Sequence, residues 1–124
     1  MNLYLAGPMS GIPRWNFDAF LEAAALLRAA GYEVVSPAEI ELEAGFDPDA
    51  PVTDYTPADY AAAMRRDIQL ILDVDGVALL PGWSSSRGAK VEAAVASAVG
   101  IPALVLRIWL ADRERILEGA RNDA

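Results

Sequence analysis

The stretch NLYLAGPMSG, residues 2–11, predicts a short strand that ends in a Gly-Pro turn. Residues 3–6 are apolar without alternation, which is typical of a strand covered on both faces, and Gly7-Pro8 stops it. Apolar residues then recur at helical spacing from Phe17 to Ala30, and Asn16 is the candidate N-cap. The N-terminus therefore predicts a strand, a loop and a helix in succession.

The same alternation continues along the chain. Thr56-Pro57-Ala58-Asp59 combines an N-cap hydroxyl, a proline at the first helical position and an acid in the first turn. It predicts a helix that runs to about Asp73. Residues 38–55 hold two prolines, one glycine and many carboxylates, and we expect an irregular loop with at most a turn of helix. The remaining predicted strands span 32–35, 75–80 and 102–106, and the remaining helices span 88–99 and 109–118.

Short apolar strands that alternate with helices are typical of a parallel sheet with helices on both faces. We therefore predict an α/β fold: one domain over residues 1–124, with a doubly wound sheet of four to five strands in a three-layer sandwich of the Rossmann or flavodoxin type.

The composition excludes several kinds of binding partner and catalytic group. The chain has 124 residues, a formal charge of −8, no Cys and no His. The acidic balance argues against a nucleic-acid polymer as partner, and the missing side chains exclude thiolate nucleophiles, imidazole bases and the commonest metal ligands. The sequence shows neither a signal peptide nor a long apolar run, so we expect no membrane association and a cytoplasmic location.

Ligands of an open parallel sheet bind at the carboxyl ends of the strands. Three loops there are candidates: Gly7, Pro8, Met9 and Ser10 after the first strand; Ser36 to Glu39 after the second; and Pro81 to Gly88, with Trp83, Ser86 and Arg87, after the third. Small residues, hydroxyls and an Arg before a helix N-terminus favour a phosphate. The alternative is that they are ordinary turn formers and that Trp83 closes the core edge instead of stacking on a ligand.

Two acids lie on or beside predicted apolar helix faces. Asp67 follows Met64 by three residues, and Glu92 precedes Val95 by three, near a helix start. The helix dipole there is expected to keep Glu92 ionised as a nucleophile. The alternatives are an ion pair of Asp67 with Arg66 and a purely local role for Glu92. The acids between Glu39 and Asp49 lack a regular ligand spacing, so we expect neither a metal site nor a cofactor.

Three segments carry a resemblance to a known family: Tyr4-Leu5-Ala6-Gly7-Pro8, Arg66-Asp67-Ile68 and Ser86-Arg87-Gly88-Ala89-Lys90-Val91-Glu92. Together they resemble the nucleoside 2-deoxyribosyltransferase family. The resemblance is greatest to its small phage and bacterial branch, which is related to the 2′-deoxynucleoside 5′-monophosphate N-glycosidases. It extends from about Leu3 to Leu106.

The resemblance implies a role for each matching residue. Glu92 matches the nucleophile that forms a covalent glycosyl ester, Asp67 the carboxylate that handles the proton of the departing base, and Tyr4 the aromatic residue that places nucleophile or sugar. Ser86 matches a serine that binds phosphate in the monophosphate hydrolases, where transferases of free nucleosides have an acid. Ala93 replaces the usual Gly after the nucleophile, and Pro8 replaces a hydroxyl residue that contacts phosphate.

We therefore expect an enzyme that cleaves the N-glycosidic bond of a (2′-deoxy)nucleoside 5′-monophosphate, with water or another base as acceptor. The expected binding residues are Gly7, Pro8, Met9, Ser10, Trp83, Ser86, Arg87 and Gly88. Transfer between free nucleosides and a non-catalytic nucleotide-binding module are the alternatives. Ala-rich helix faces and the resemblance favour a homodimer or a higher homo-oligomer.

Overall fold

Four short strands form one parallel sheet in the computed structural model, which describes residues 1–122. They are β1 (Asn2–Ala6), β2 (Glu33–Val35), β3 (Gly76–Leu79) and β4 (Ala103–Val105), in the order β2-β1-β3-β4. Each neighbouring pair is parallel, so all carboxyl ends meet at one edge of the sheet. The chain leaves β1 toward β2 on one side and returns to β3 on the other. The α/β fold with a doubly wound sheet is confirmed, and β1 and β3 lie at its switch point.

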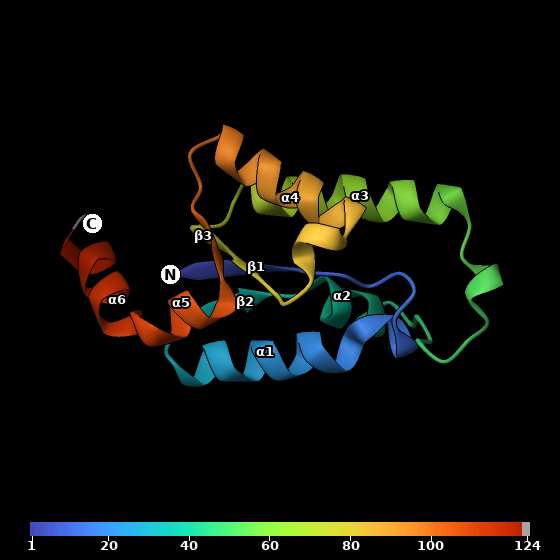
Figure 1. Ribbon diagram of the computed structural model, residues 1–124, viewed down its shortest axis with the longest axis horizontal. Coiled ribbons are helices and arrows are strands. Elements are labelled where there is room, and N and C mark those ends of the chain that lie inside the picture. The colour runs from blue at the N-terminus through green and yellow to red at the C-terminus, as the bar shows by residue number, and fades with distance from the viewer. Residues whose placement is uncertain (123–124) are drawn as a thin grey trace.

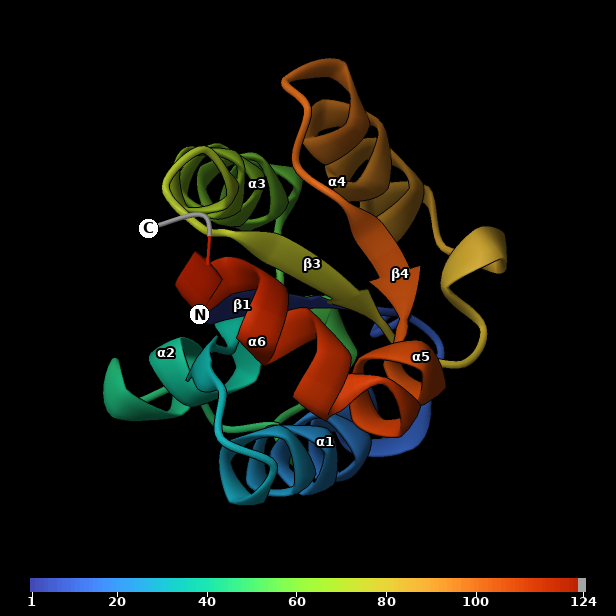
Figure 2. The same cartoon turned by 90° about the vertical axis from the view of Figure 1, so that its left-hand side faces the viewer.

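Helices cover both faces of the sheet (Figures 1 and 2). Helices α3 (Pro57–Ile71) and α4 (Arg87–Ala98) lie on one face. Helices α1 (Phe17–Ala29), α2 (Pro37–Glu43) and α5 (Leu106–Ala111) lie on the other, and α6 (Arg113–Asn122) follows α5. Three single turns of 3-10 helix complete the structure: η1 (Pro13–Asn16), η2 (Val52–Asp54) and η3 (Trp83–Ser85). Among the described residues, no helix is both long and apolar enough to cross a membrane.

The core consists of two layers, one on each face of the sheet. Leu3 and Leu5 of β1 pack toward α1 and α5, with Phe20 and Trp109. Successive strand residues point to opposite faces, so Tyr4 belongs to the other layer, beneath α3 and α4. Burial on both faces explains why β1 is apolar without alternation.

The structure corrects three predictions. Residues 38–55 are not an irregular loop throughout, because α2 occupies Pro37–Glu43. The final helix, predicted over 109–118, is two helices: α5 begins directly after β4, and α6 follows α5. Asn16 occupies the N-cap position of α1 with a positive φ of 60°, and its side chain makes no capping hydrogen bond. Its amide instead donates to the carbonyl oxygen of Pro8 at 2.9 Å. The other predicted elements agree to within two residues at each end.

The start of α3 agrees in detail with the sequence. The side chain of Thr56 accepts a hydrogen bond from the backbone N–H of Asp59, and the Asp59 carboxylate accepts one from the N–H of Thr56. This capping box, with Pro57 at the first helical position, fixes where α3 begins. The start of the helix determines which residues lie on its inner face, and Asp67 is one of them.

Candidate active site

A cavity of about 930 Å³ opens between the β1 loop, α3 and the N-terminus of α4; we call it the main cavity. It lies at the carboxyl ends of β1 and β3, where the topology predicts a ligand. The structure brings most of the predicted site residues to its wall: Gly7, Pro8, Met9, Ser10, Asp67, Ser86, Arg87, Gly88 and Glu92. Tyr4 is fully buried, and its hydroxyl donates a hydrogen bond to Oε2 of Glu92.

Glu92 lies in the second turn of α4, and its exposed fraction is only 6%. Burial raises the pKa of Glu92 to about 8, the charge of Asp67 adds to that effect, and the Tyr4 hydroxyl opposes it. The expectation that the helix dipole keeps Glu92 ionised is therefore wrong. The dipole acts within the first turn of a helix, and desolvation outweighs it here.

Asp67 is 8% exposed and lies on the inner face of α3. The Nε and Nη2 atoms of Arg66 lie 3.0 Å and 2.9 Å from its Oδ1 atom, so the ion pair with Arg66 is present. Burial raises the pKa of Asp67, whereas Arg66 and the Tyr4 hydroxyl hold it down. Burial and the charges of Glu92 and Asp67 in turn raise the pKa of Tyr4 well above its ordinary value, so Tyr4 stays a hydrogen-bond donor.

The N-terminus of α4 forms one side of the cavity mouth. The Oγ atom of Ser86 caps the helix by accepting from the N–H of Ala89 at 3.2 Å. The guanidinium of Arg87 lies 5.8 Å from the centre of the Tyr60 ring, within the range of a cation–π contact. A Cβ atom on Gly88 would lie 3.1 Å from Cε of Met64, so a larger residue would crowd the wall.

The β1 loop forms the opposite side. A Cβ atom on Gly7 would approach Cβ of Leu80 to 2.8 Å, so only glycine lets the ends of β1 and β3 come this close. The hydrogen bond from Asn16 to the Pro8 carbonyl ties the loop to the start of α1. A hydrogen bond between a side chain and the backbone thus holds each side of the mouth.

Trp83 lies apart from this site. It packs against the core layer beneath α4 and lines a separate hollow with Leu79, Lys90 and Ala93. The alternative in which Trp83 closes the core edge fits this position. Ser36 does not line the main cavity either: it is 2% exposed, and within the described residues its Oγ atom has no hydrogen-bond partner.

Sequence reasoning missed several residues that line the main cavity, among them Trp15, Tyr55, Tyr60, Met64 and Arg65. Tyr60 and Met64 belong to the same apolar stripe as Asp67, and this spacing was the available signal. Trp15 lies in η1 and Tyr55 in the loop before α3, with ring centres 4.9 Å apart. No local pattern predicts that two residues forty positions apart share a wall.

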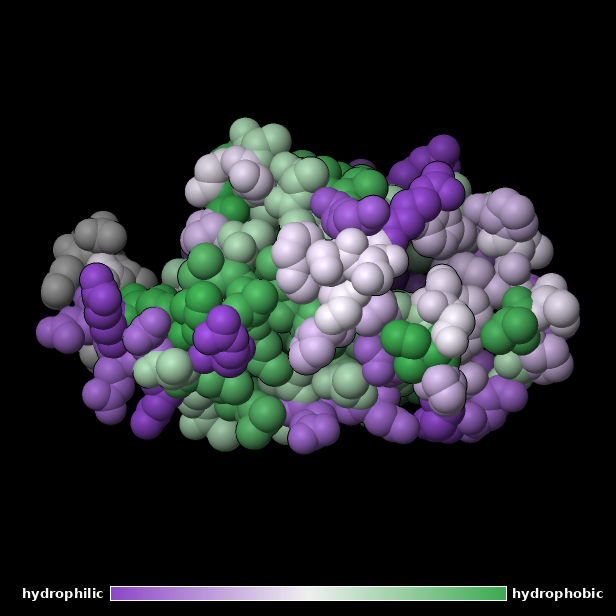
Figure 3. All heavy atoms as spheres, viewed as in Figure 1, coloured by the Kyte–Doolittle hydropathy of each residue, from purple (hydrophilic) through white to green (hydrophobic). Residues whose placement is uncertain are grey.

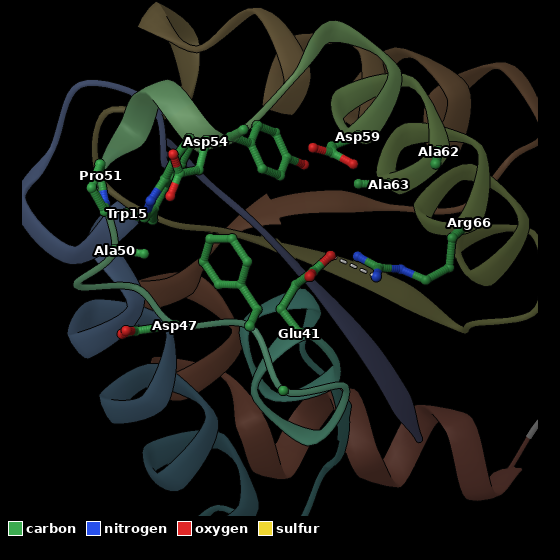
Figure 4. Close-up of a pocket in the computed structure, with 13 residues that line it drawn as sticks. Trp15, Glu41, Asp47, Ala50, Pro51, Asp54, Asp59, Ala62, Ala63 and Arg66 are labelled. Atoms are coloured by element: carbon green, nitrogen blue, oxygen red, sulfur yellow. Dashed lines mark hydrogen bonds and ion pairs between the residues drawn. The ribbon is translucent and has the colours of Figure 1, made fainter.

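These two rings also line a second cavity, of about 620 Å³, which we call the side cavity (Figure 4). Trp15 and Tyr55 border both cavities, and the ion pair of Arg66 with Glu41 lies at the wall of the side cavity. Acids also line it from the loop after α2, from η2 and from α3: Asp47, Asp54 and Asp59. Within residues 1–122, no group of three or more acidic side chains is arranged to hold a metal ion.

The sequence profile of the family described as Domain of unknown function (DUF4406) matches residues 1–105. The chain belongs to this family. The DUF4406 match includes every strand and both sides of the main cavity. None of the curated proteins matches the chain by sequence.

Among solved structures, the DUF4406 chain is similar to a 2-deoxyribosyltransferase from the psychrotolerant bacterium Bacillus psychrosaccharolyticus. The two share a TM-score of 0.59 and 20% identity, over 84% of this chain and 71% of the other. At this identity the similarity establishes a common fold.

Proposed function

We propose that this protein cleaves the N-glycosidic bond of a (2′-deoxy)nucleoside 5′-monophosphate. The proposal rests on one observation: Asp67 and Glu92 line the same cavity, and the buried Tyr4 donates a hydrogen bond to Glu92. Glycoside cleavage requires two carboxyl groups and needs neither imidazole nor thiolate. A chain without His and Cys therefore has the necessary groups.

The proposed reaction has two steps. The Glu92 carboxylate attacks C1′ of the sugar, the bond from C1′ to the base nitrogen breaks with its electron pair, and Asp67 gives the base its proton. Water, deprotonated by Asp67, or a second base then attacks C1′ and releases the Glu92 carboxylate. Two displacements at one carbon retain its configuration. In this role Tyr4 stabilises the ionised form of Glu92 by donating to it.

The mouth of the cavity supports a phosphate on the substrate. The Ser86 oxygen accepts from the backbone, so its own hydroxyl hydrogen is available to a phosphate oxygen. Arg87 and Arg65 place two cations at the mouth of a protein whose net charge is −8. With the loop from Gly7 to Ser10 opposite, they form an anion site of the kind found at helix N-termini.

The test is base release, followed by chromatography, from a panel of ribo- and deoxyribonucleoside 5′-monophosphates and the matching nucleosides. We expect free base from a nucleotide and its loss, by at least about 1000-fold, in Glu92→Gln. Retention of most turnover by Glu92→Gln would show that Glu92 is not the nucleophile. Nucleotide binding without base release in the wild type would favour the non-catalytic module instead.

A second candidate function is deoxyribosyl transfer between free nucleosides and bases. It is favoured by the fold shared with a 2-deoxyribosyltransferase that is described as a biocatalyst for nucleoside synthesis. Ser86 separates the two functions, because an acid there would repel a phosphate. We expect Ser86→Asp to raise KM for the nucleotide at least about tenfold and to spare the nucleoside. A new nucleoside formed from a free base, with nucleotides inert, would instead favour transfer between free nucleosides.

We also propose that the protein forms a homodimer or a higher homo-oligomer. Hydrophobic residues gather over β4 and α5 on one face (Figure 3), and β4 is a half-buried strand at the sheet edge. Ala23 and Ala24 of α1 are buried within the subunit, so this part of the Ala-rich surface is not available for assembly. Light scattering measures the molar mass in solution, and we expect at least twice the mass of one chain. A monomeric mass at all accessible concentrations would refute the proposal.

A further inference from the structure

Arg66 contacts the candidate acid Asp67 from outside the main cavity. Arg66 borders the side cavity, whereas Asp67 borders the main one. Both guanidinium contacts, from Nε and Nη2, fall on the Oδ1 atom of Asp67, which leaves Oδ2 as the oxygen clear of the guanidinium. The third nitrogen, Nη1, donates to Oε1 of Glu41 at 2.7 Å (Figure 4). A single Arg thus links α2 to the acid on α3.

The three side chains are shielded from solvent to different degrees. Their side-chain exposures are 31% for Arg66, 22% for Glu41 and 12% for Asp67. Charges that are partly removed from water interact more strongly than surface pairs do. The planar guanidinium holds the carboxyl group through two nitrogens, which a lysine ammonium cannot reproduce. Glu41 fixes the guanidinium in turn, so Asp67 has one preferred orientation.

We propose that Arg66, anchored by Glu41, is a positioning residue that fixes the orientation of Asp67 and sets the protonation of its carboxyl group beside Glu92. Its effect on base release rests on the proposed function. Arg66 itself lies behind the acid and is not expected to touch the substrate.

The charged and titratable groups that face Asp67 come from every element around it. Arg66 lies beside it on α3, Glu41 on α2, Tyr4 on β1, Glu92 on α4, and Tyr55 in the loop before α3. Burial and the charge of Glu41 raise the pKa of Asp67, and Arg66 is the positive group that opposes them. Without Arg66, the carboxyl group keeps its proton to a higher pH.

Arg28 supplies a matched control for removing Arg66. Its Nη1 and Nη2 atoms hold Glu39 at 2.7 Å and 2.6 Å, and Glu39, like Glu41, lies on α2. Arg28→Gln therefore removes a two-nitrogen ion pair of the same helix and leaves Asp67 untouched. Any effect of Arg66→Gln that comes only from loosening α2 should appear in Arg28→Gln as well.

The first experiment needs no substrate. Aspartate labelled with ¹³C at the carboxyl carbon is titrated by NMR, and the Asp67 resonance is assigned by its loss in Asp67→Asn. We expect its midpoint to rise by about one pH unit or more in Arg66→Gln and to stay at the wild-type value in Arg28→Gln. An unchanged midpoint in Arg66→Gln, or an equal shift in both variants, overturns the proposal.

The second experiment measures turnover with a substrate found by the base-release panel. We expect kcat to fall by about 10- to 100-fold in Arg66→Gln with KM nearly unchanged, and Arg66→Lys to recover part of the loss. Glu41→Ala should lower kcat less, and its addition to Arg66→Gln should have no further effect. A raised KM at constant kcat would mean that Arg66 binds substrate directly, against the proposal.

The two experiments separate this inference from the proposed function. If the wild type releases no base from any compound of the panel, the proposed function fails, and the carbon titration still decides whether Arg66 sets the protonation of Asp67. If the wild type is active and Arg66→Gln behaves like Arg28→Gln in both experiments, the positioning role alone is refuted.

Discussion

Glu92 and Asp67 are two acids in one buried site, and the protein holds fewer charges there than two free carboxylates would carry. The pKa of Glu92 is raised to about 8, and that of Asp67 is also raised. Protons therefore leave the pair in steps that belong to both groups. Near neutral pH Glu92 is therefore mainly protonated, whereas the proposed attack on C1′ requires its carboxylate.

This protonation state predicts the pH dependence of activity. Because kcat/KM reports groups of the free enzyme, and the proposed first step needs an ionised Glu92 together with a protonated Asp67, the slope of log kcat/KM against pH should change near pH 8, where Glu92 loses its proton. Initial rates at low substrate concentration between pH 5.5 and 9.5 measure it. A profile that is flat across pH 8 would contradict the assignment of Glu92 as a nucleophile that must ionise.

The same shift predicts that Glu92 lowers stability at high pH. A carboxyl group with a raised folded pKa contributes most below its unfolded value of 4.5, and the contribution is lost as the pH rises to about 8. At pH 9 the folded protein must bury an ionised Glu92, and Glu92→Gln replaces that charge with a neutral amide. The variant should therefore raise Tm at pH 9 by several degrees and change it little at pH 4.5. Thermal unfolding at both pH values checks this, with the exposed Glu22→Gln as control. Equal effects of Glu92→Gln at both values would contradict it.

At the scale of elements, the sequence predicts best where the signals are local. The Thr56 capping box lies within four residues of sequence and correctly places the start of α3. Helix α2 was missed because seven residues are too few for a periodic pattern, although Ser36 before Pro37 and Glu39 was a helix-start signal. The pairing of Glu41 with Arg66 joins residues 25 positions apart and leaves no local pattern. Asp67 and Glu92 could be found from the sequence because they lie beside apolar helix faces, whereas the residues that contact them could not.

Helix α5 is fixed to the sheet by Trp109, and this contact depends on a glycine. The indole N–H of Trp109 lies within hydrogen-bond distance of the carbonyl oxygens of Val77, at 3.0 Å, and Leu104, at 3.1 Å. A Cβ atom on Gly76 would lie 2.5 Å from the indole ring, so Gly76→Ala forces the ring out of place. We expect a loss of about 2–3 kcal/mol in urea unfolding. Gly119→Ala, where a Cβ atom meets nothing within 4 Å, should not destabilise, and equal effects would refute the packing argument.

At the scale of the whole molecule, the sheet topology determines where the main cavity lies, and the loops determine how far it is closed. The order β2-β1-β3-β4 opens the main cavity at the switch point. The loops around Trp15 and Tyr55 close one side of it, and Phe46 joins them from the loop after α2. How well this aromatic wall excludes water bears on whether water or a second base resolves the proposed glycosyl ester.

Phe46 offers a test of that exclusion, because it borders the side cavity and not the main one. Its ring centre lies 6.0 Å from Trp15, 5.6 Å from Phe17 and 6.0 Å from Tyr55. Phe46→Ala removes these contacts, so we expect a stability loss of about 2–3 kcal/mol. With the wall loosened, the ratio of hydrolysis to transfer should rise, measured by chromatography with a second base present. Leu26→Ala, at an exposed site on α1, is the control. A ratio that stays constant while stability falls would mean that the aromatic wall supports the fold and does not control water.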